Sequence, residues 1–136
     1  MSAVADALPQ ALVAFRPRYP ELAATLMETA AVVPLVHTRT GFEVDLVVAG
    51  SGLEQIALGR ATAAVLDGVL VPVASATDLV VMKVLAGRGK DLDDVRAIIA
   101  GGEVDLAEVR DLLAQLEAAL DQSDLLPTLE AALQDR

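Results

Sequence analysis

AVVPLVHTRTGFEVDLVVA, residues 31–49, carries the strongest β-strand pattern in the chain. Its two halves, 31–38 and 42–49, are rich in β-branched side chains, which favour extended backbone. They are joined by Arg39-Thr40-Gly41, where the glycine can take the positive φ that a tight turn requires. The pattern therefore predicts an antiparallel β-hairpin.

The second half of this hairpin places two acids on one face. Side chains alternate along a strand, so Glu43 and Asp45 share one face and the apolar residues 42, 44, 46 and 48 share the other. Two carboxylates at this spacing can hold a divalent cation, because both project from a rigid element into one space. A solvated strand face is the alternative, and an isolated E-x-D pattern is more often that. Asp45 is the stronger metal candidate, since its neighbours in sequence are apolar.

Farther along, the pattern predicts a second hairpin and then a series of helices. Ser51 can cap a helix that continues to about residue 61. Residues 62–73 predict a shorter hairpin around Asp67-Gly68, with Pro72 at an edge or end of its strand. The helices expected after it are 76–86, begun by Ser75 or Thr77 and ended at Gly87-Arg88-Gly89; 91–100; the amphipathic segment 105–119; and 123–133.

Residues 3–15 and 21–30 also contain good helix formers, with Pro9 interrupting the first and Pro20 opening the second. Together the elements predict an α+β fold. A small mixed or antiparallel sheet, built from the hairpins at 31–49 and 62–73, packs with helices and is followed by a helical C-terminal tail. A chain of 136 residues is long enough for one compact domain. We expect a single domain over 1–136, with an α/β part to about residue 74 and a helical part over 75–136.

The composition argues against several classes of function. A net charge of −10 disfavours nonspecific binding to nucleic acid, and an aromatic content of 2% disfavours stacking of bases. The sequence has no cysteine and one histidine, which excludes thiolate and histidine-rich metal sites. There is no basic leader and no run of about 18 uncharged apolar residues. We therefore expect a cytoplasmic protein that does not enter the membrane.

The cations are concentrated in one segment. Residues 83–96 hold four of the ten Lys and Arg residues, whereas 101–136 are strongly acidic. Lys83 is the only charge between Asp78 and Arg88, inside the apolar helix DLVVMKVLAG. It either extends its stem along a buried helix or presents an ammonium to a phosphate. Any anion-binding site should lie in this segment.

The next segment, GRGKDLDDVR at 87–96, combines flexible glycines with cations and acids. Asp91 and Asp94 fall on one helical face, and Asp93 is placed to pair with Arg96 three residues later. Capping of a helix by Asp91 explains much of this pattern, although a glycine-rich loop before a helix can also bind phosphate. His37 has no Ser or Cys partner in a recognisable motif, so we expect it to be structural.

Three ordered strings carry a family resemblance: HTRTGFEVDL at 37–46, GLEQIALGRA at 52–61 and VPVASATDLVVMKVLAGRGKDLDDVR at 71–96. Over roughly residues 30–100 the chain resembles the later part of the nucleotidyltransferase superfamily, in particular the enzymes related to AbiEii-type toxins. The resemblance implies a mixed sheet on which three carboxylates hold two Mg²⁺ ions. These ions position a nucleoside triphosphate and activate an acceptor hydroxyl.

The resemblance also implies roles for individual residues. The third family carboxylate sits in a V-D-L context, which matches Asp45. Lys83 matches a lysine that contacts the triphosphate, and Asp91 and Asp94 match a D-x-x-D-like segment beside it. In this reading Asp45 is the catalytic residue, and Glu43 is a second metal ligand only because the strand spacing places it on the same face. Lys83, Asp91 and Asp94 form the nucleotide-binding region.

The chain departs from the family at its beginning. Family enzymes carry a Gly-Ser or Gly-Gly turn followed by two acids as D-x-D or D-x-E, and nothing before residue 37 fits that pattern. Gly50-Ser51 follows the third-acid strand instead. One carboxylate does not hold two metal ions, because each needs several oxygen ligands. We therefore expect a protein that is inactive alone, with an open sheet edge that takes a protein partner or a second copy.

A different class of function is also consistent with the sequence. The chain can be a non-catalytic binding or scaffold protein of a toxin–antitoxin-like pair, which docks its partner on the amphipathic helix at 105–119. Its apolar stripe, including Leu112 and Leu116, recurs at three- and four-residue steps. Such a stripe is more often part of a core.

Overall fold

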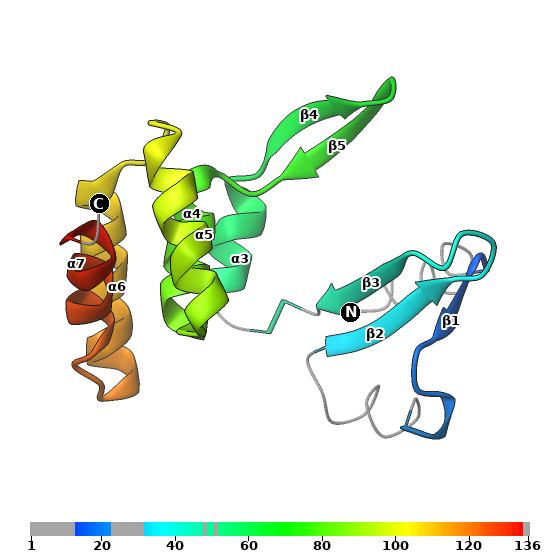
Figure 1. The fold of residues 1–136 in the computed structure, drawn as a ribbon, viewed down its shortest axis with the longest axis horizontal. Helices are drawn as coiled ribbons and strands as arrows, with labels where there is room; N and C mark the ends of the chain where they lie inside the picture. The colour runs from blue at the N-terminus through cyan, green and yellow to red at the C-terminus, as the bar shows by residue number, and fades with distance from the viewer. Residues whose placement is uncertain (1–12, 23–31, 48, 51, 135–136) are drawn as a thin grey trace. The chain divides into compact units, whose positions relative to one another are not determined.

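The computed structural model of the chain describes residues 13–22, 32–47, 49–50 and 52–134. The described residues form five α-helices and two antiparallel sheets, so the predicted α+β class is confirmed. The chain divides into two compact units, Met1–Gln55 and Ile56–Arg136, and helix α3 (Gly52–Gly59) runs across the division. The elements are labelled in Figure 1.

The first unit contains a three-stranded sheet in the order β1-β2-β3. Its strands are β1 (Phe15–Pro17), β2 (Val32–His37) and β3 (Glu43–Val47), and a short 3-10 helix, η1 (Pro20–Leu22), follows β1. β2 and β3 form the predicted antiparallel hairpin, with Leu35 opposite Val44. Gly41 has the expected positive φ of 71°, which lets the chain reverse between them.

Strand β1 differs from the sequence prediction. The helix predicted over 3–15 does not reach Phe15, because that residue begins a strand that pairs antiparallel with β2. The strand is three residues long and ends in a proline, so it offers no alternating pattern that would reveal it. The rest of that predicted helix, and residues 23–30 of the helix predicted over 21–30, lie outside the described residues.

A second hairpin, β4 (Thr62–Leu66) and β5 (Val69–Val73), lies in the second unit. Both turn residues have positive φ, 49° at Asp67 and 80° at Gly68, as a two-residue hairpin turn requires. The hairpin itself was predicted, but its place in the fold was not. It forms a separate two-stranded sheet instead of joining the hairpin at 31–49 in one sheet.

Helix α4 (Ala76–Ala86) follows its predicted caps, whereas α5 (Gly89–Ala100) is not capped by Asp91 as expected. Helix α4 begins at Ser75, whose side chain accepts a hydrogen bond from the Asp78 N–H, and ends at Gly87 with φ 65°. Helix α5 starts two residues earlier than predicted, with Arg88 as its N-cap. Helix α6 (Leu106–Leu120) is capped by Asp105, and α7 (Leu125–Gln134) is the last described element.

The core of the second unit lies among these helices. α4 packs against α5, α6 and α7, and α7 also packs against α5 and α6. Fully buried side chains come from all four helices, and each stabilises the fold by roughly 1.5–3 kcal/mol through loss of apolar surface to water. They include Val80, Val81, Val84, Val95, Val109, Leu113 and Leu129.

The division between the units falls earlier than the change in character seen in the sequence. The sequence placed that change near residue 74. The boundary between the compact units falls between Gln55 and Ile56 in the sequence, which groups the β4–β5 hairpin with the helices. Whether the two units behave as one domain stays a prediction. No helix within the described ranges combines the length and the apolar character that crossing a membrane demands.

Candidate functional site

A cluster of charged side chains joins α4 to α5. Lys83 extends from the third turn of α4, and its Nζ lies 3.1 Å from Asp91 Oδ1 and 2.6 Å from Asp94 Oδ2. Asp91 and Asp94 lie three residues apart on α5, so both reach the same ammonium. The structure therefore brings together the three residues predicted as the nucleotide-binding region. We call Lys83, Asp91, Asp94 and the neighbouring Arg88 the α4–α5 cluster.

Asp91 is the fixed centre of this cluster, because its side chain has no exposed surface. Arg88 donates from Nε to Asp91 Oδ2 at 2.5 Å and from Nη2 to Asp91 Oδ1 at 3.2 Å. The hydrogen bonds from Arg88 lower the pKa of the Asp91 carboxyl to about 2, with Lys83 adding to the effect and burial opposing it. Asp91 is therefore ionised at neutral pH and holds two cations at the start of α5.

Lys83 is more exposed than Asp91. Hydrogen bonds from its ammonium to Asp94 and then to Asp91 raise its pKa, so it carries its charge at neutral pH. Its side chain is 26% exposed and that of Asp94 is 53% exposed. Lys83 thus has one buried partner that positions it and one exposed partner that an incoming anion can replace.

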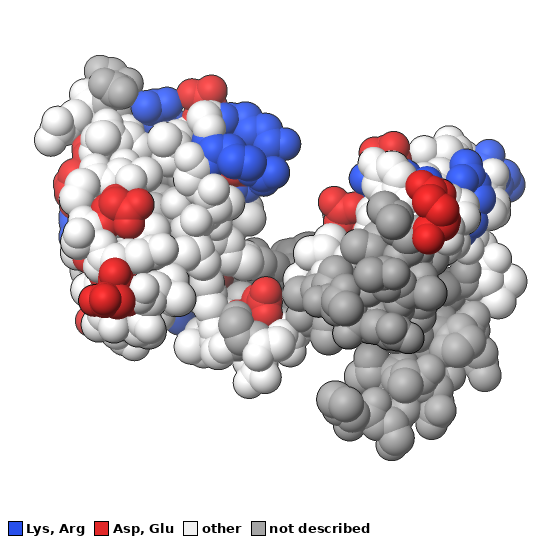
Figure 2. All heavy atoms as spheres, turned by 90° about the horizontal axis from the view of Figure 1, so that it is seen from below, with Lys and Arg blue, Asp and Glu red and all other residues white. Residues whose placement is uncertain are grey.

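Exposed basic side chains lie at the start of α5, beside this cluster in the sequence. Figure 2 shows Lys and Arg concentrated on one part of the helical unit, with Asp and Glu more scattered over the face in view. Arg88 and Lys90, at the start of α5, are both exposed. A helix N-terminus adds partial positive charge from its free N–H groups. Residues 83–96 hold four cations against three acids, although the whole chain has a charge of −10.

The predicted metal ligands lie on β3 in the first unit. Glu43 and Asp45 share a face as predicted, because one guanidinium contacts both. Arg18 Nη2 lies 3.0 Å from Asp45 Oδ1 and 3.6 Å from Glu43 Oε2. The two carboxylates are 63% and 57% exposed, respectively. Sequence reasoning missed Arg18, because the segment RPRYP at 16–20 showed no strand pattern that would place it beside β2 and within reach of β3.

The two predicted halves of the site lie in different compact units. Asp45 belongs to the first unit and Lys83 to the second, so their predicted proximity stays a prediction. In the ranges that the structure describes, no three His, Cys, Asp or Glu side chains form a group suited to a metal ion. Metal binding by Glu43 and Asp45 likewise stays a prediction, and Arg18 would compete with the ion for Asp45.

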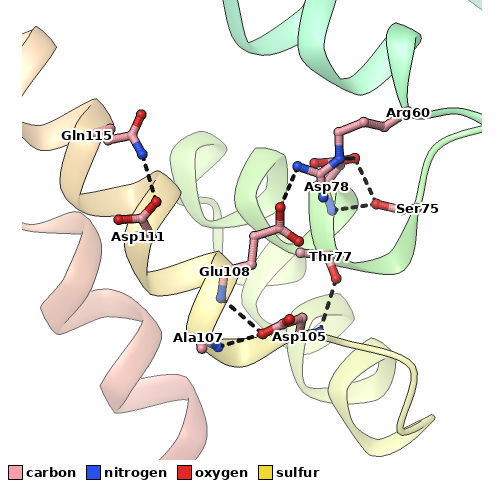
Figure 3. Close-up of polar contacts among 9 residues, drawn as sticks. All are labelled: Arg60, Ser75, Thr77, Asp78, Asp105, Ala107, Glu108, Asp111 and Gln115. Carbon is pink, nitrogen blue, oxygen red and sulfur yellow. Dashed lines mark hydrogen bonds and ion pairs between the residues drawn. The ribbon is translucent and has the colours of Figure 1, made fainter.

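A second polar cluster, absent from the sequence prediction, ties α3 to α4 and α6 (Figure 3). Arg60, just after α3, lies with Nε 3.3 Å from Asp78 Oδ2 and Nη1 2.6 Å from Glu108 Oε1. The hydrogen bond to Glu108 is the main cause of the raised pKa of Arg60. Asp78 is fully buried and also accepts from the Ser75 hydroxyl at 2.7 Å. The sequence predicted a helix start at Ser75 or Thr77, but not the burial of Asp78.

Two other predicted features have clear structural roles. His37 lies with Nδ1 2.7 Å from the Thr40 hydroxyl, across the turn of the first hairpin, and its ring is tilted against Phe15. The apolar stripe of α6 is turned into the core, where Val109 and Leu113 are fully buried. Leu112 and Leu116 flank it and are only partly exposed. The face proposed to dock a partner is therefore largely used by the fold itself.

Comparison with known proteins adds no assignment: no family model, no curated protein and no solved structure matches this chain.

Proposed function

We propose that this chain is a nucleotidyltransferase-like protein whose α4–α5 cluster contacts the phosphates of a nucleoside triphosphate, and that it does not transfer a nucleotide by itself. The observation that carries the proposal is the position of Lys83. An ammonium with apolar neighbours in sequence is held by a buried acid, beside an exposed acid and an N-terminal helix turn. These are the residues that the family resemblance marks as nucleotide-binding.

The geometry supports a simple exchange of partners. A phosphate oxygen replaces the exposed Asp94 on Lys83, while Asp91 keeps the ammonium in place. Arg88 and Lys90 lie close enough in sequence to reach the same triphosphate. Asp91 acts as a positioning residue here, because its buried carboxylate holds Lys83 without facing the ligand.

The proposal that the chain is inactive alone depends on its carboxylates. By resemblance, Asp45 supplies one of three acids that a two-metal site needs, and Glu43 adds a neighbouring oxygen. The described residues hold no group of three potential metal ligands. We therefore expect Mg²⁺ to enter mainly as the counterion of the triphosphate.

Structural pairing is the competing explanation for the α4–α5 cluster, since the same contacts would tie two helices together without any ligand. Titration calorimetry with Mg²⁺ and each nucleoside triphosphate separates the two. We expect binding by the native chain, a loss of roughly tenfold in affinity for Lys83→Ala, and a weaker Mg²⁺-dependent component for Asp45→Asn.

Arg110→Ala is the matched control, because it removes a cation from another helix-to-helix ion pair, 2.7 Å from Glu130. It should bind as the native chain does. If the native chain does not bind, or if Lys83→Ala and Arg110→Ala bind equally well, then the α4–α5 cluster has a structural role alone. If Asp45→Asn binds as the native chain does, only Asp45 is removed from the proposed site.

A further inference from the structure

The β4–β5 hairpin is apolar on both faces and exposed on both. Val65 and Leu70, which face each other across the hairpin, are 67% and 68% exposed, and the next pair, Leu66 and Val69, is also exposed. A strand that is hydrophobic throughout is typical of a sheet covered on both faces. An isolated two-stranded hairpin is only marginally stable in water, so an added strand would stabilise this one.

The register shows which edge of the hairpin can accept that partner. Opposite residues of an antiparallel pair alternate between hydrogen-bonded and non-hydrogen-bonded, and a two-residue turn closes on a hydrogen-bonded pair, here Leu66 and Val69. Counting back, Ala63 and Val65 direct their N–H and C=O groups away from β5. On the other edge the corresponding residues are Leu70 and Pro72, and proline has no N–H to donate.

The outer edge of β4 can therefore accept another strand, whereas Pro72 hinders pairing at the outer edge of β5. Among the described residues β4 pairs with β5 and with no other strand. Thr62–Leu66 contains no charge and no proline, which are the usual devices that prevent strands from pairing edge to edge. An extended strand added to β4 would gain the backbone hydrogen bonds of Ala63 and Val65.

We propose that this partner is β4 of a second copy of the chain, paired antiparallel about a twofold axis. Ala63 then exchanges both hydrogen bonds with Val65 of the second copy, Ala64 faces Ala64 across the axis, and the two hairpins form a four-stranded sheet. The inference does not depend on nucleotide binding.

Charge favours this occupant. Each chain has a net charge of −10, but between residues 61 and 75 the only charged side chain is Asp67. In the proposed register Asp67 lies opposite Ala61 of the second copy, next to its Arg60, which already pairs with Asp78 and Glu108 of its own chain. Two strongly acidic chains therefore meet through a strand that carries no charge, which avoids like-charge repulsion across the pairing edge.

The test uses charge pairs at the axis. Ala64→Lys and Ala64→Glu each place like charges directly opposite one another in a homodimer, and mixing the two variants places opposite charges there. Sedimentation of the full chain, from low-micromolar to submillimolar concentration, should show a native dimer. We expect each variant alone to dimerise roughly tenfold more weakly, and the mixture to regain dimerisation as a heterodimer.

Leu70→Lys is the matched control, because it adds the same charge to the same hairpin but away from the axis. It should dimerise more tightly than Ala64→Lys, and circular dichroism should show that every variant is folded. A monomeric native chain at all concentrations overturns the proposal, even if it captures another protein. So does a dimer that is insensitive to position 64, or a mixture that dimerises no better than its components.

Discussion

Asp91 and Asp45 are both acids that contact an arginine, yet their surroundings differ completely. Asp91 is buried at the start of α5 between Arg88 and Lys83, whereas Asp45 projects from β3 and is 57% exposed. Burial strengthens an ion pair and makes its loss costly, while water and salt screen an exposed pair. Asp91 therefore contributes to the fold of the second unit, whereas Asp45 in the first unit stays accessible to further contacts.

The comparison predicts that the surroundings of Asp91 matter more than any exposed pair. Leu113→Ala should have the largest effect, because it opens a cavity in the helical core that holds α4 in place. We expect a loss of about 2–5 kcal/mol in the free energy of unfolding, measured by urea denaturation. A loss below about 1 kcal/mol would show that the helical core is loosely packed and does not fix the α4–α5 cluster.

Asp91→Asn should produce the next largest effect, and one that depends on pH. The folded pKa of Asp91 is about 2, below its ordinary value of 3.8, so folding favours the ionised form. Its contribution is complete above pH 3.8 and is lost as the pH falls toward 2. The Tm of the native chain should therefore fall as the pH is lowered from 3.8 to about 2.

The variant should be less stable than the native chain at neutral pH and should show a flatter pH dependence between these values. Asp45→Asn is the control, since it removes an exposed acid and should leave the acid dependence unchanged. Equal pH profiles for the native chain and Asp91→Asn would contradict the assignment of the low pKa to Asp91.

Arg60→Gln should destabilise the second unit by several degrees in Tm. It leaves Asp78, which is fully buried, with the Ser75 hydroxyl but without a cation. Glu108→Gln, which removes an exposed partner of the same Arg60, should cost less. An equal effect of the two substitutions would mean that burial of Asp78 is not the reason for the cost.

Asp45→Asn should have the smallest effect on stability, about 0.5 kcal/mol or less. The Arg18–Asp45 contact is an exposed ion pair, and high salt should remove what it contributes. Urea unfolding in low and high salt checks this. A larger loss that persists in high salt would place Asp45 in the same class as Asp91 and end the contrast.

The sequence predicted much of the fold because local signals specify it. Alternating β-branched residues and Asp67-Gly68 predicted both hairpins, and Ser75 and Gly87 predicted where helix α4 begins and ends. Strand β1 was missed because three residues with a proline carry no period. The separation of the two hairpins into different sheets depends on contacts distant in sequence, which no local pattern records.

The sequence predicted which residues form the candidate site, but not their burial or all of their partners. Spacing placed Asp91 and Asp94 on one face, and the apolar surroundings singled out Lys83. The burial of Asp91 and Asp78 was missed, since it depends on how α4, α5 and α6 pack. Arg18 and Arg60 were missed for the same reason, because each meets its acid across elements that only folding brings together.

The proposed function requires that Lys83 and the start of α5 bind the phosphates of a nucleotide. Backbone amide chemical shifts, recorded while a nucleoside triphosphate with Mg²⁺ is added, test it most directly. We predict changes centred on Lys83 and on residues 88–94, and their loss in Lys83→Ala. Shifts that spare these residues, or that remain the same in Lys83→Ala, would contradict the claim.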